Sequence, residues 1–196
     1  MDSFILDLKK TAFVSIDLQK GITSLGAAPN STPDVIRNAA KLADAFRKKG
    51  SPVVLVNVSS KDGKDMLAPV VDLQGWRGVG ERPKNWAELV PELNEQEGDL
   101  LITKRQWGAF YGTELDLQLR RRKIETIVLC GISTNIGVET TAREAYQHGY
   151  NIVIATDACT ARTSEEHEHS MKFIFPRIAR VRTTEEILSA INRHRV

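Results

Sequence analysis

The residues of this chain with the clearest capacity for chemistry come directly after apolar segments. Asp17 follows "TAFVSI", Lys104 follows "DLLIT", and the turn "GISTNIG" at 131–137 follows "TIVLC". A carboxylate beside an ammonium group can exchange a proton with a substrate while the cation stabilises developing negative charge. The turn adds Ser133, Thr134 and backbone amides at the start of a helix, where amides can form an oxyanion hole.

Taken singly, Asp17 and Lys104 have simpler explanations. An aspartate after a strand often caps a turn or a helix, and a lysine at a strand end commonly faces solvent. The combination is more informative, because the carboxyl ends of the strands in an open α/β sheet border one ligand crevice. We therefore expect both side chains and the 131–137 turn to face a single crevice. Asp157, which ends a further apolar segment, is expected there too.

Short apolar segments alternate with helical patterns along the chain. The candidate strands are mostly apolar on both faces, as central parallel strands are, and lie at 11–17, 52–58, 99–103, 126–131, 151–156 and 177–182. The last one alternates with arginine and is expected at a partly exposed edge. The candidate helices lie at 31–50, 113–123, 135–149, 163–175 and 183–194. This alternation predicts an α/β protein with one doubly wound parallel sheet.

Capping signals mark several helix ends. Thr32 is the predicted N-cap of the first long helix, and Gly50 is its predicted stop. Thr163 and Thr183 each precede a glutamate by three residues, which predicts two capping boxes.

Composition limits the location and the partners of the protein. The 196 residues suffice for one domain, taken as 1–196, and are few for two. With 27% charged residues and a net charge of +2, the chain lacks the basic excess of nucleic-acid-binding proteins, and "RRRK" (120–123) fits a helix end. Cys130 and Cys159 are interpreted as free thiols, and no segment has the pattern of a signal peptide or a membrane span. We expect a soluble, cytoplasmic protein that binds a small molecule and neither nucleic acid nor membrane.

Three stretches carry a resemblance to a known family: "AFVSIDLQKG", "ITKRQWGAFYGTELDLQLRRRKIETIVLCGISTNIGVETTAREAYQHGY" and "VIATDACTA". They resemble the isochorismatase-like hydrolases, a family that also contains cysteine hydrolases such as nicotinamidase. The resemblance implies a Rossmann-like, three-layer α/β/α fold with a six-stranded parallel sheet of order 3-2-1-4-5-6. It implies an active site between the first and fourth strands, an Asp17–Lys104 pair and a cis peptide between Ile132 and Ser133. It also implies a homo-oligomer, a dimer or larger.

The main departure from the cysteine hydrolases is Gly137. In those enzymes the residue that matches Gly137 is the nucleophilic cysteine, so covalent thiol catalysis cannot operate at this position. Cys130 lies inside a predicted strand, where we expect a structural role, and Cys159 belongs to a different turn. Isochorismatases proper resemble this chain in having a small residue there. They hydrolyse a vinyl ether by protonating carbon, after which water attacks, and this resemblance assigns the general acid to Asp17 and its electrostatic partner to Lys104.

No metal or other cofactor is expected. Nicotinamidases of the family bind a divalent ion through an aspartate and histidines in the loop after the second strand, and the corresponding loop here contains no histidine. His167 and His169 fall on different sides of a predicted helix, which is a poor arrangement for metal ligands.

The substrate pocket is expected to be aromatic. The long stretch 59–83 is rich in glycine and charge and is predicted to hold binding loops or a lid. Candidate substrate contacts there and after Lys104 are Trp76, Arg77, Arg82, Trp86, Trp107, Phe110 and Tyr111, with Arg77, Trp107, Phe110 and Tyr111 preferred. The alternative is that these aromatic residues pack the loop or form a subunit interface.

Three functions therefore stay open. The first is hydrolysis of a small carboxylated substrate, and the most specific version of this hypothesis is a vinyl ether such as isochorismate. The second is a hydrolase in which Asp17 activates water towards a small amide or ester. The third is a binding protein that retains the Asp17–Lys104 pair without catalysis.

Overall fold

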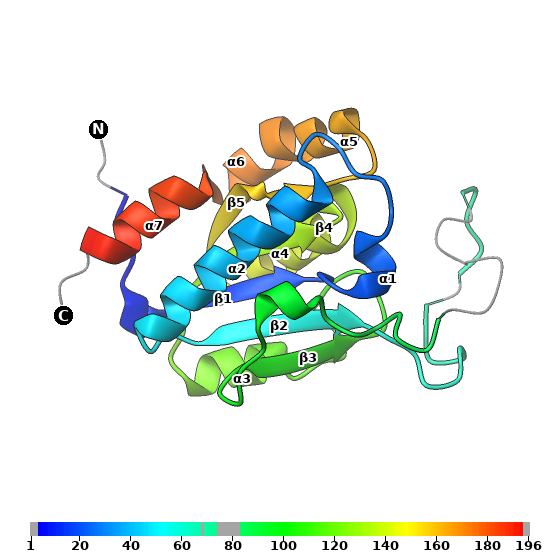
Figure 1. Ribbon diagram of the computed structural model, residues 1–196, viewed down its shortest axis with the longest axis horizontal. Helices are drawn as coiled ribbons and strands as arrows, with labels where there is room; N and C mark the ends of the chain where they lie inside the picture. The colour runs from blue at the N-terminus through cyan, green and yellow to red at the C-terminus, as the bar shows by residue number, and fades with distance from the viewer. Residues whose placement is uncertain (1–3, 68, 74–82, 194–196) are drawn as a thin grey trace.

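A six-stranded parallel sheet runs through the computed structural model, which describes residues 4–67, 69–73 and 83–193 (Figure 1). Its strands are β1 (Thr11–Ile16), β2 (Val53–Val58), β3 (Leu100–Lys104), β4 (Thr126–Ile132), β5 (Asn151–Thr160) and β6 (Arg180–Arg182). Their order is β3-β2-β1-β4-β5-β6, which confirms the expected 3-2-1-4-5-6 topology. Chain order reverses between β1 and β4, and the crevice at such a reversal is where open α/β sheets bind ligands.

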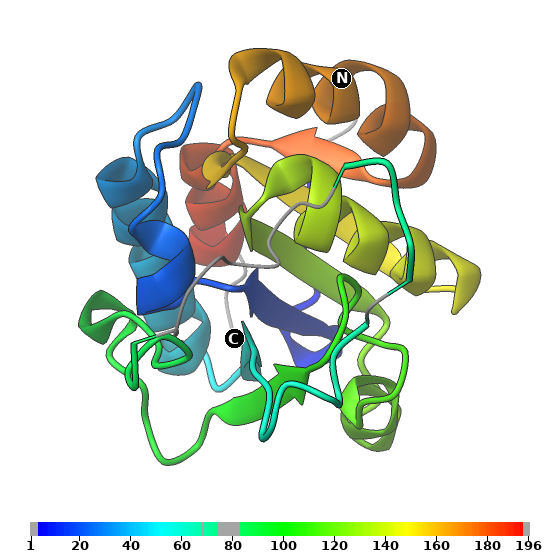
Figure 2. The same ribbon diagram turned by 90° about the vertical axis from the view of Figure 1, so that its right-hand side faces the viewer.

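Helices cover both faces of the sheet and make the three layers (Figure 2). α2 (Thr32–Lys48) and α7 (Thr184–Arg193) lie on one face, and α3 (Leu115–Arg121) and α4 (Glu139–Gln147) lie on the other. The shorter helical segments are η1 (Leu8–Lys10), α1 (Lys20–Thr23), η2 (Pro91–Leu93), η3 (Thr134–Val138), α5 (Ser164–His169), η4 (Ser170–Ile174) and α6 (Phe175–Ile178). No helix within the described ranges is long and apolar enough to cross a membrane.

The core follows the hydrophobic pattern of the sequence. Every residue of β1 is buried, as expected for a central strand covered on both faces. α2 presents a buried apolar stripe to the sheet, and Phe46 from this stripe packs against Phe13 of β1 with ring centroids 5.9 Å apart. β6 has no fully buried residue, which confirms the partly exposed edge.

Several element boundaries differ from the sequence-based expectation. The sixth strand is shorter than 177–182, because Phe175–Ile178 is helical. The fifth strand continues past 156 to Thr160. The N-cap of α2 is Ser31 rather than Thr32, since the Ser31 hydroxyl accepts a hydrogen bond from the backbone of Asp34.

Both predicted capping boxes are confirmed. At Thr163 the side chain accepts from the backbone N–H of Glu166, whose carboxylate in turn accepts from the Thr163 N–H. The same reciprocal pair joins Thr183 and Glu186 at the start of α7.

Candidate active site

The site is built around the carboxylate that follows β1. Asp17 is 5% exposed and has a φ of 54°, in the left-handed region that few non-glycine residues adopt. Its backbone N–H donates to the Val56 carbonyl at 2.9 Å, so the chain leaves the sheet directly after this hydrogen bond. An uncommon backbone conformation at a buried acid is a frequent property of functional sites.

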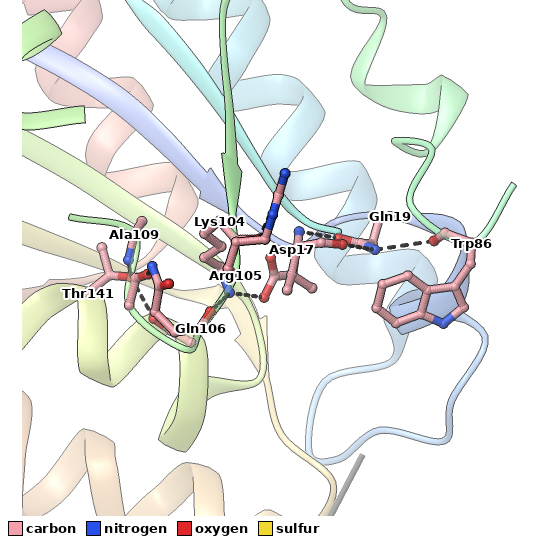
Figure 3. Close-up of polar contacts among 11 residues, drawn as sticks. Asp17, Gln19, Trp86, Lys104, Arg105, Gln106, Ala109 and Thr141 are labelled. Carbon is pink, nitrogen blue, oxygen red and sulfur yellow. Dashed lines mark hydrogen bonds and ion pairs between the residues drawn. The ribbon is translucent and has the colours of Figure 1, made fainter. Parts of the chain in front are cut away.

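Lys104 is the direct partner of Asp17. It is the last residue of β3 and is 2% exposed, and its Nζ donates to Asp17 Oδ2 at 2.7 Å (Figure 3). The same Nζ donates to the Gln106 carbonyl at 3.1 Å. The structure therefore brings the two predicted residues together at the carboxyl ends of two strands that flank β2.

Burial and the ammonium group of Lys104 shift the pKa of Asp17 in opposite directions. Burial raises the pKa of Asp17 to about 6, and the charge and hydrogen bond of Lys104 partly oppose this rise. Asp17 Oδ1 is buried and has no hydrogen-bond partner among the described residues. A carboxyl group with one oxygen held and the other unpaired is suited to exchanging a proton with a bound molecule.

Gly137 borders this carboxylate. A Cβ atom built on Gly137 would lie 3.2 Å from Asp17 Oδ2 and 3.0 Å from Ile16 Cγ2, which is tighter than ordinary van der Waals contact. Gly137 belongs to the π-helical turn η3, which joins β4 to α4, and the expected cis peptide Ile132–Ser133 precedes this turn. The missing side chain therefore leaves the Asp17 carboxyl group next to bare backbone.

A second glycine sets the approach of β4 to β1. Gly131 is opposite Ile16 in the strand register and has a φ of 130°. A Cβ atom at Gly131 would lie 2.1 Å from the Ile16 carbonyl oxygen, a separation that no side chain can occupy. Glycine is required here because the two backbones meet immediately before Asp17 and the turn that contains Gly137.

Two threonines brace the turn from different sides. The Thr141 hydroxyl donates to the Gly137 carbonyl at 2.7 Å and accepts from the Ala109 N–H at 3.2 Å, which ties α4 to the loop after β3 (Figure 3). Thr134 is fully buried, and its Oγ1 lies 2.9 Å from Nδ1 of His167. Thr134 was expected to contact substrate, but its hydroxyl is engaged by His167 instead. Ser133, the other predicted contact of the turn, is half-buried.

Gln19 is a buried polar residue of the site region that the sequence reasoning missed. Its amide donates to the carbonyls of Val58 and Trp86 at 3.0 and 3.2 Å, and its oxygen accepts from the Val58 N–H at 2.8 Å (Figure 3). These bonds join the end of β2 to Trp86, inside the long connection between β2 and β3, at a position two residues beyond Asp17. The available signal was a glutamine two residues after the candidate acid, in "IDLQKG".

The predicted aromatic contacts separate into different environments. Trp107 lies beside the turn, because its carbonyl oxygen is 3.5 Å from the Cβ position of Gly137, and its side chain is 60% exposed. Tyr111 is 75% exposed. Arg77, like Trp76 and Arg82, lies outside the described residues.

Phe110 does not line the crevice, contrary to expectation. Its side chain is buried, and its ring stacks on His148 at 5.2 Å and packs against Tyr150 at 5.7 Å. These partners follow the C-terminal end of α4, whereas the turn that contains Gly137 lies at its N-terminal end. Phe110 therefore packs against the C-terminal end of α4 and the residues that follow it.

Asp157 is also misplaced by the sequence reasoning. Because β5 extends to Thr160, Asp157 lies within the strand rather than at its carboxyl end. Its carboxylate accepts from the backbone N–H and the hydroxyl of Thr184 at 2.7 and 2.8 Å. Asp157 thus anchors the start of α7, on the sheet face opposite α4.

The two cysteines are poorly suited to nucleophilic catalysis. Cys130 and Cys159 are free thiols and fully buried. Burial raises the pKa of the Cys130 thiol well above its usual range and that of Cys159 to about 12, so the reactive thiolate is disfavoured.

The described residues offer poor ligands for a metal of the nicotinamidase kind. No group of three or more His, Cys, Asp or Glu side chains within these ranges is arranged to hold a metal ion. In the loop after β2, Asp65 accepts hydrogen bonds from Arg105 and Ser60.

Comparisons with known proteins concern the family and the fold of the chain. The isochorismatase domain model matches residues 11–186. The isochorismatase family protein YwoC of Bacillus subtilis is 54% identical over 97% of this chain and 99% of its own length. YecD of Escherichia coli O157:H7, from the same family, is 52% identical over 95% of this chain and 98% of its own. A solved isochorismatase family protein from Burkholderia thailandensis superposes with a TM-score of 0.91 at 41% identity, covering 96% of this chain and 98% of its own. The chain belongs to the isochorismatase family of hydrolases, within the cysteine hydrolase superfamily.

Proposed function

We propose that this protein hydrolyses a small carboxylated substrate without a covalent enzyme intermediate, with Asp17 as the general acid and Lys104 as its electrostatic partner. The observation that carries the proposal is the buried carboxyl group of Asp17. One of its oxygens is held by Lys104, the other is unpaired among the described residues, and Gly137 next to it has no side chain. This arrangement favours proton delivery and provides no nucleophile at position 137.

A vinyl ether such as isochorismate fits this chemistry best. Protonated Asp17 donates its proton to the terminal carbon of the enol ether, which produces an oxocarbenium ion. Water adds to that ion and returns a proton to Asp17, and the resulting hemiketal breaks its carbon–oxygen bond to release an alcohol and a keto acid. The products thus contain the substrate plus one water, and the enzyme regains its starting protonation state.

Lys104 has two roles in this scheme. Its two hydrogen bonds to Asp17 and to the Gln106 carbonyl fix the ammonium group and leave one proton for the carboxylate of the substrate. A buried, immobilised cation stabilises anionic ligands more strongly than a cation in water does.

The experiment is incubation of the purified protein with isochorismate, with pyruvate release followed by a coupled lactate dehydrogenase assay. Asp17→Asn removes the acid but keeps the shape of the side chain, and we expect turnover to fall at least about 100-fold, since general acids contribute 10²–10⁴-fold. Asp44→Asn, at an exposed position of α2, is the matched control and should keep wild-type turnover. Wild-type turnover by the Asp17→Asn variant would refute the assignment.

The second candidate function is hydrolysis of a small amide or ester by a water molecule that Asp17 deprotonates. It is favoured by the pKa of about 6, which leaves most Asp17 carboxyl groups ionised at neutral pH. A panel of small amides and esters, monitored by release of ammonia or acid, separates this function from the first. Thermal stabilisation by a carboxylated ligand that is never converted would instead identify a binding protein.

A further inference from the structure

One face of α5 and of the start of η4 packs against the segment that carries Gly137. His167 is 5% exposed and Ser170, one helical turn later, is fully buried, while His169 between them is exposed. Nδ1 of His167 lies 2.9 Å from Thr134 Oγ1, and the Ser170 hydroxyl donates to Glu139 Oε2 at 2.6 Å. These two hydrogen bonds fasten the start of η3 and the start of α4 to the same helical face.

The hydrogen bond between His167 and Thr134 holds a turn whose displacement would change the surroundings of Asp17. Thr134 begins the π-helical turn that contains Gly137, and the Gly137 Cβ position is 3.2 Å from the carboxylate of Asp17. Both partners are buried, so losing one of them leaves the other with a buried polar atom that water cannot easily reach. The hydrogen bond between His167 and Thr134 therefore strongly favours this one conformation of the turn.

We propose that His167 is a positioning residue for the reaction: through Thr134 it holds the turn of Gly137 in place against Asp17. Its effect on turnover rests on the proposed function, whereas its effect on the turn does not. His167 contacts neither Asp17 nor Lys104 in the hydrogen bonds of the described residues, so it acts through the turn alone.

The chemical state of His167 suggests a conservative replacement. Burial lowers the pKa of His167, with nearby Glu168 opposing this, so the imidazole is neutral at physiological pH. A neutral ring nitrogen either accepts from or donates to the threonine hydroxyl, depending on the tautomer. The side-chain amide of asparagine can do both at nearly the position of Nδ1, so His167→Asn is a rescue variant.

The test compares His167→Ala, His167→Asn and Thr134→Val with the double variant His167→Ala/Thr134→Val. His169→Ala is the matched control, since this histidine is on the same helix and its ring packs against Phe173 outside the site. Backbone amide exchange over residues 132–138 is measured by mass spectrometry, with β2 as the internal reference. The same proteins are assayed for kcat and KM on the substrate that the wild type turns over.

We expect His167→Ala and Thr134→Val each to speed exchange of the turn about tenfold relative to β2, the effect of losing one hydrogen bond. kcat should fall about tenfold or more while KM changes less than about threefold, because a misplaced turn affects the reacting geometry more than binding. The double variant should lose no more than the worse single variant, since both remove one interaction. His167→Asn should recover most of the loss, and His169→Ala should match the wild type.

Wild-type exchange of the turn in His167→Ala would overturn the proposal, and so would additive losses in the double variant. If the wild type hydrolyses nothing in the substrate panel, the proposed function fails, yet the exchange experiment still decides whether His167 holds the turn. If hydrolysis is observed but kcat is unchanged in His167→Ala, the positioning role is wrong and the proposed function stands.

Discussion

Asp17 makes the stability of this protein depend on pH in a direction opposite to that of most aspartates. Its pKa rises from 3.8 to about 6 on folding, because burial outweighs the attraction of Lys104. A group whose pKa is raised in the folded state favours folding most below its unfolded value, and this contribution is lost as the pH rises through the folded value. The stabilising contribution of Asp17 is therefore lost between about pH 4 and about pH 6.

The magnitude follows from the same two values. Each tenfold change in proton affinity is worth about 1.4 kcal/mol, so the rise from 3.8 to about 6 corresponds to a loss of about 3 kcal/mol across this pH range. Asparagine resembles the protonated acid but cannot ionise. The free energy of unfolding of the Asp17→Asn variant, measured relative to wild type, should therefore rise by about 3 kcal/mol between pH 3.5 and pH 8.

The assay is urea unfolding of both proteins, followed by circular dichroism at half-unit steps from pH 3.5 to pH 8. Subtracting the two curves cancels the other titrating groups. A flat difference for Asp17→Asn, or one in which the wild type gains stability with rising pH, would refute the reasoning. The latter result would mean that the ion pair with Lys104 outweighs burial.

Three further predictions concern the same site. Gly131→Ala should destabilise the fold by at least about 3 kcal/mol in urea unfolding, because its Cβ would lie 2.1 Å from the Ile16 carbonyl oxygen, and a loss below about 1 kcal/mol would contradict this. Gly137→Ala should lower the free energy of unfolding by about 1–3 kcal/mol and should also lower kcat, because the new Cβ would displace Ile16 and Asp17. An unchanged kcat would show that the turn tolerates a side chain. If Asp17 is the acid, kcat/KM should fall as the pH rises through about 6, whereas a profile that rises through this value would identify a base.

The pH profile of activity also bears on Lys104. Because the ammonium group lowers the pKa of Asp17, Lys104→Met should move the limb of the profile that belongs to Asp17 to higher pH than in wild type. A limb that stays in place in this variant would mean that another group titrates.

The sheet, its helical layers and the main residues of the candidate site could be predicted from the sequence alone. Short strands that are apolar on both faces, separated by amphipathic helices, have few ways to bury their surfaces, and the sheet and its layers follow from this. The residue types at the ends of β1, β3 and β4 are equally visible, because parallel strands place their carboxyl ends at one edge. Asp17, Lys104 and the Gly137 turn could therefore be proposed from the chain before any distance was known.

Only the tertiary structure decided how these residues are packed and what supports them. Phe110 and Asp157 have the expected residue types, but packing directs them away from the crevice. Gln19 and His167 act through partners 39 and 33 residues away in the chain. Local periodicity reports which face of an element is apolar, whereas the pairing of buried polar groups depends on the mutual arrangement of several elements. For that reason the hydrogen bonds that hold the site residues in place could be identified only from the tertiary structure.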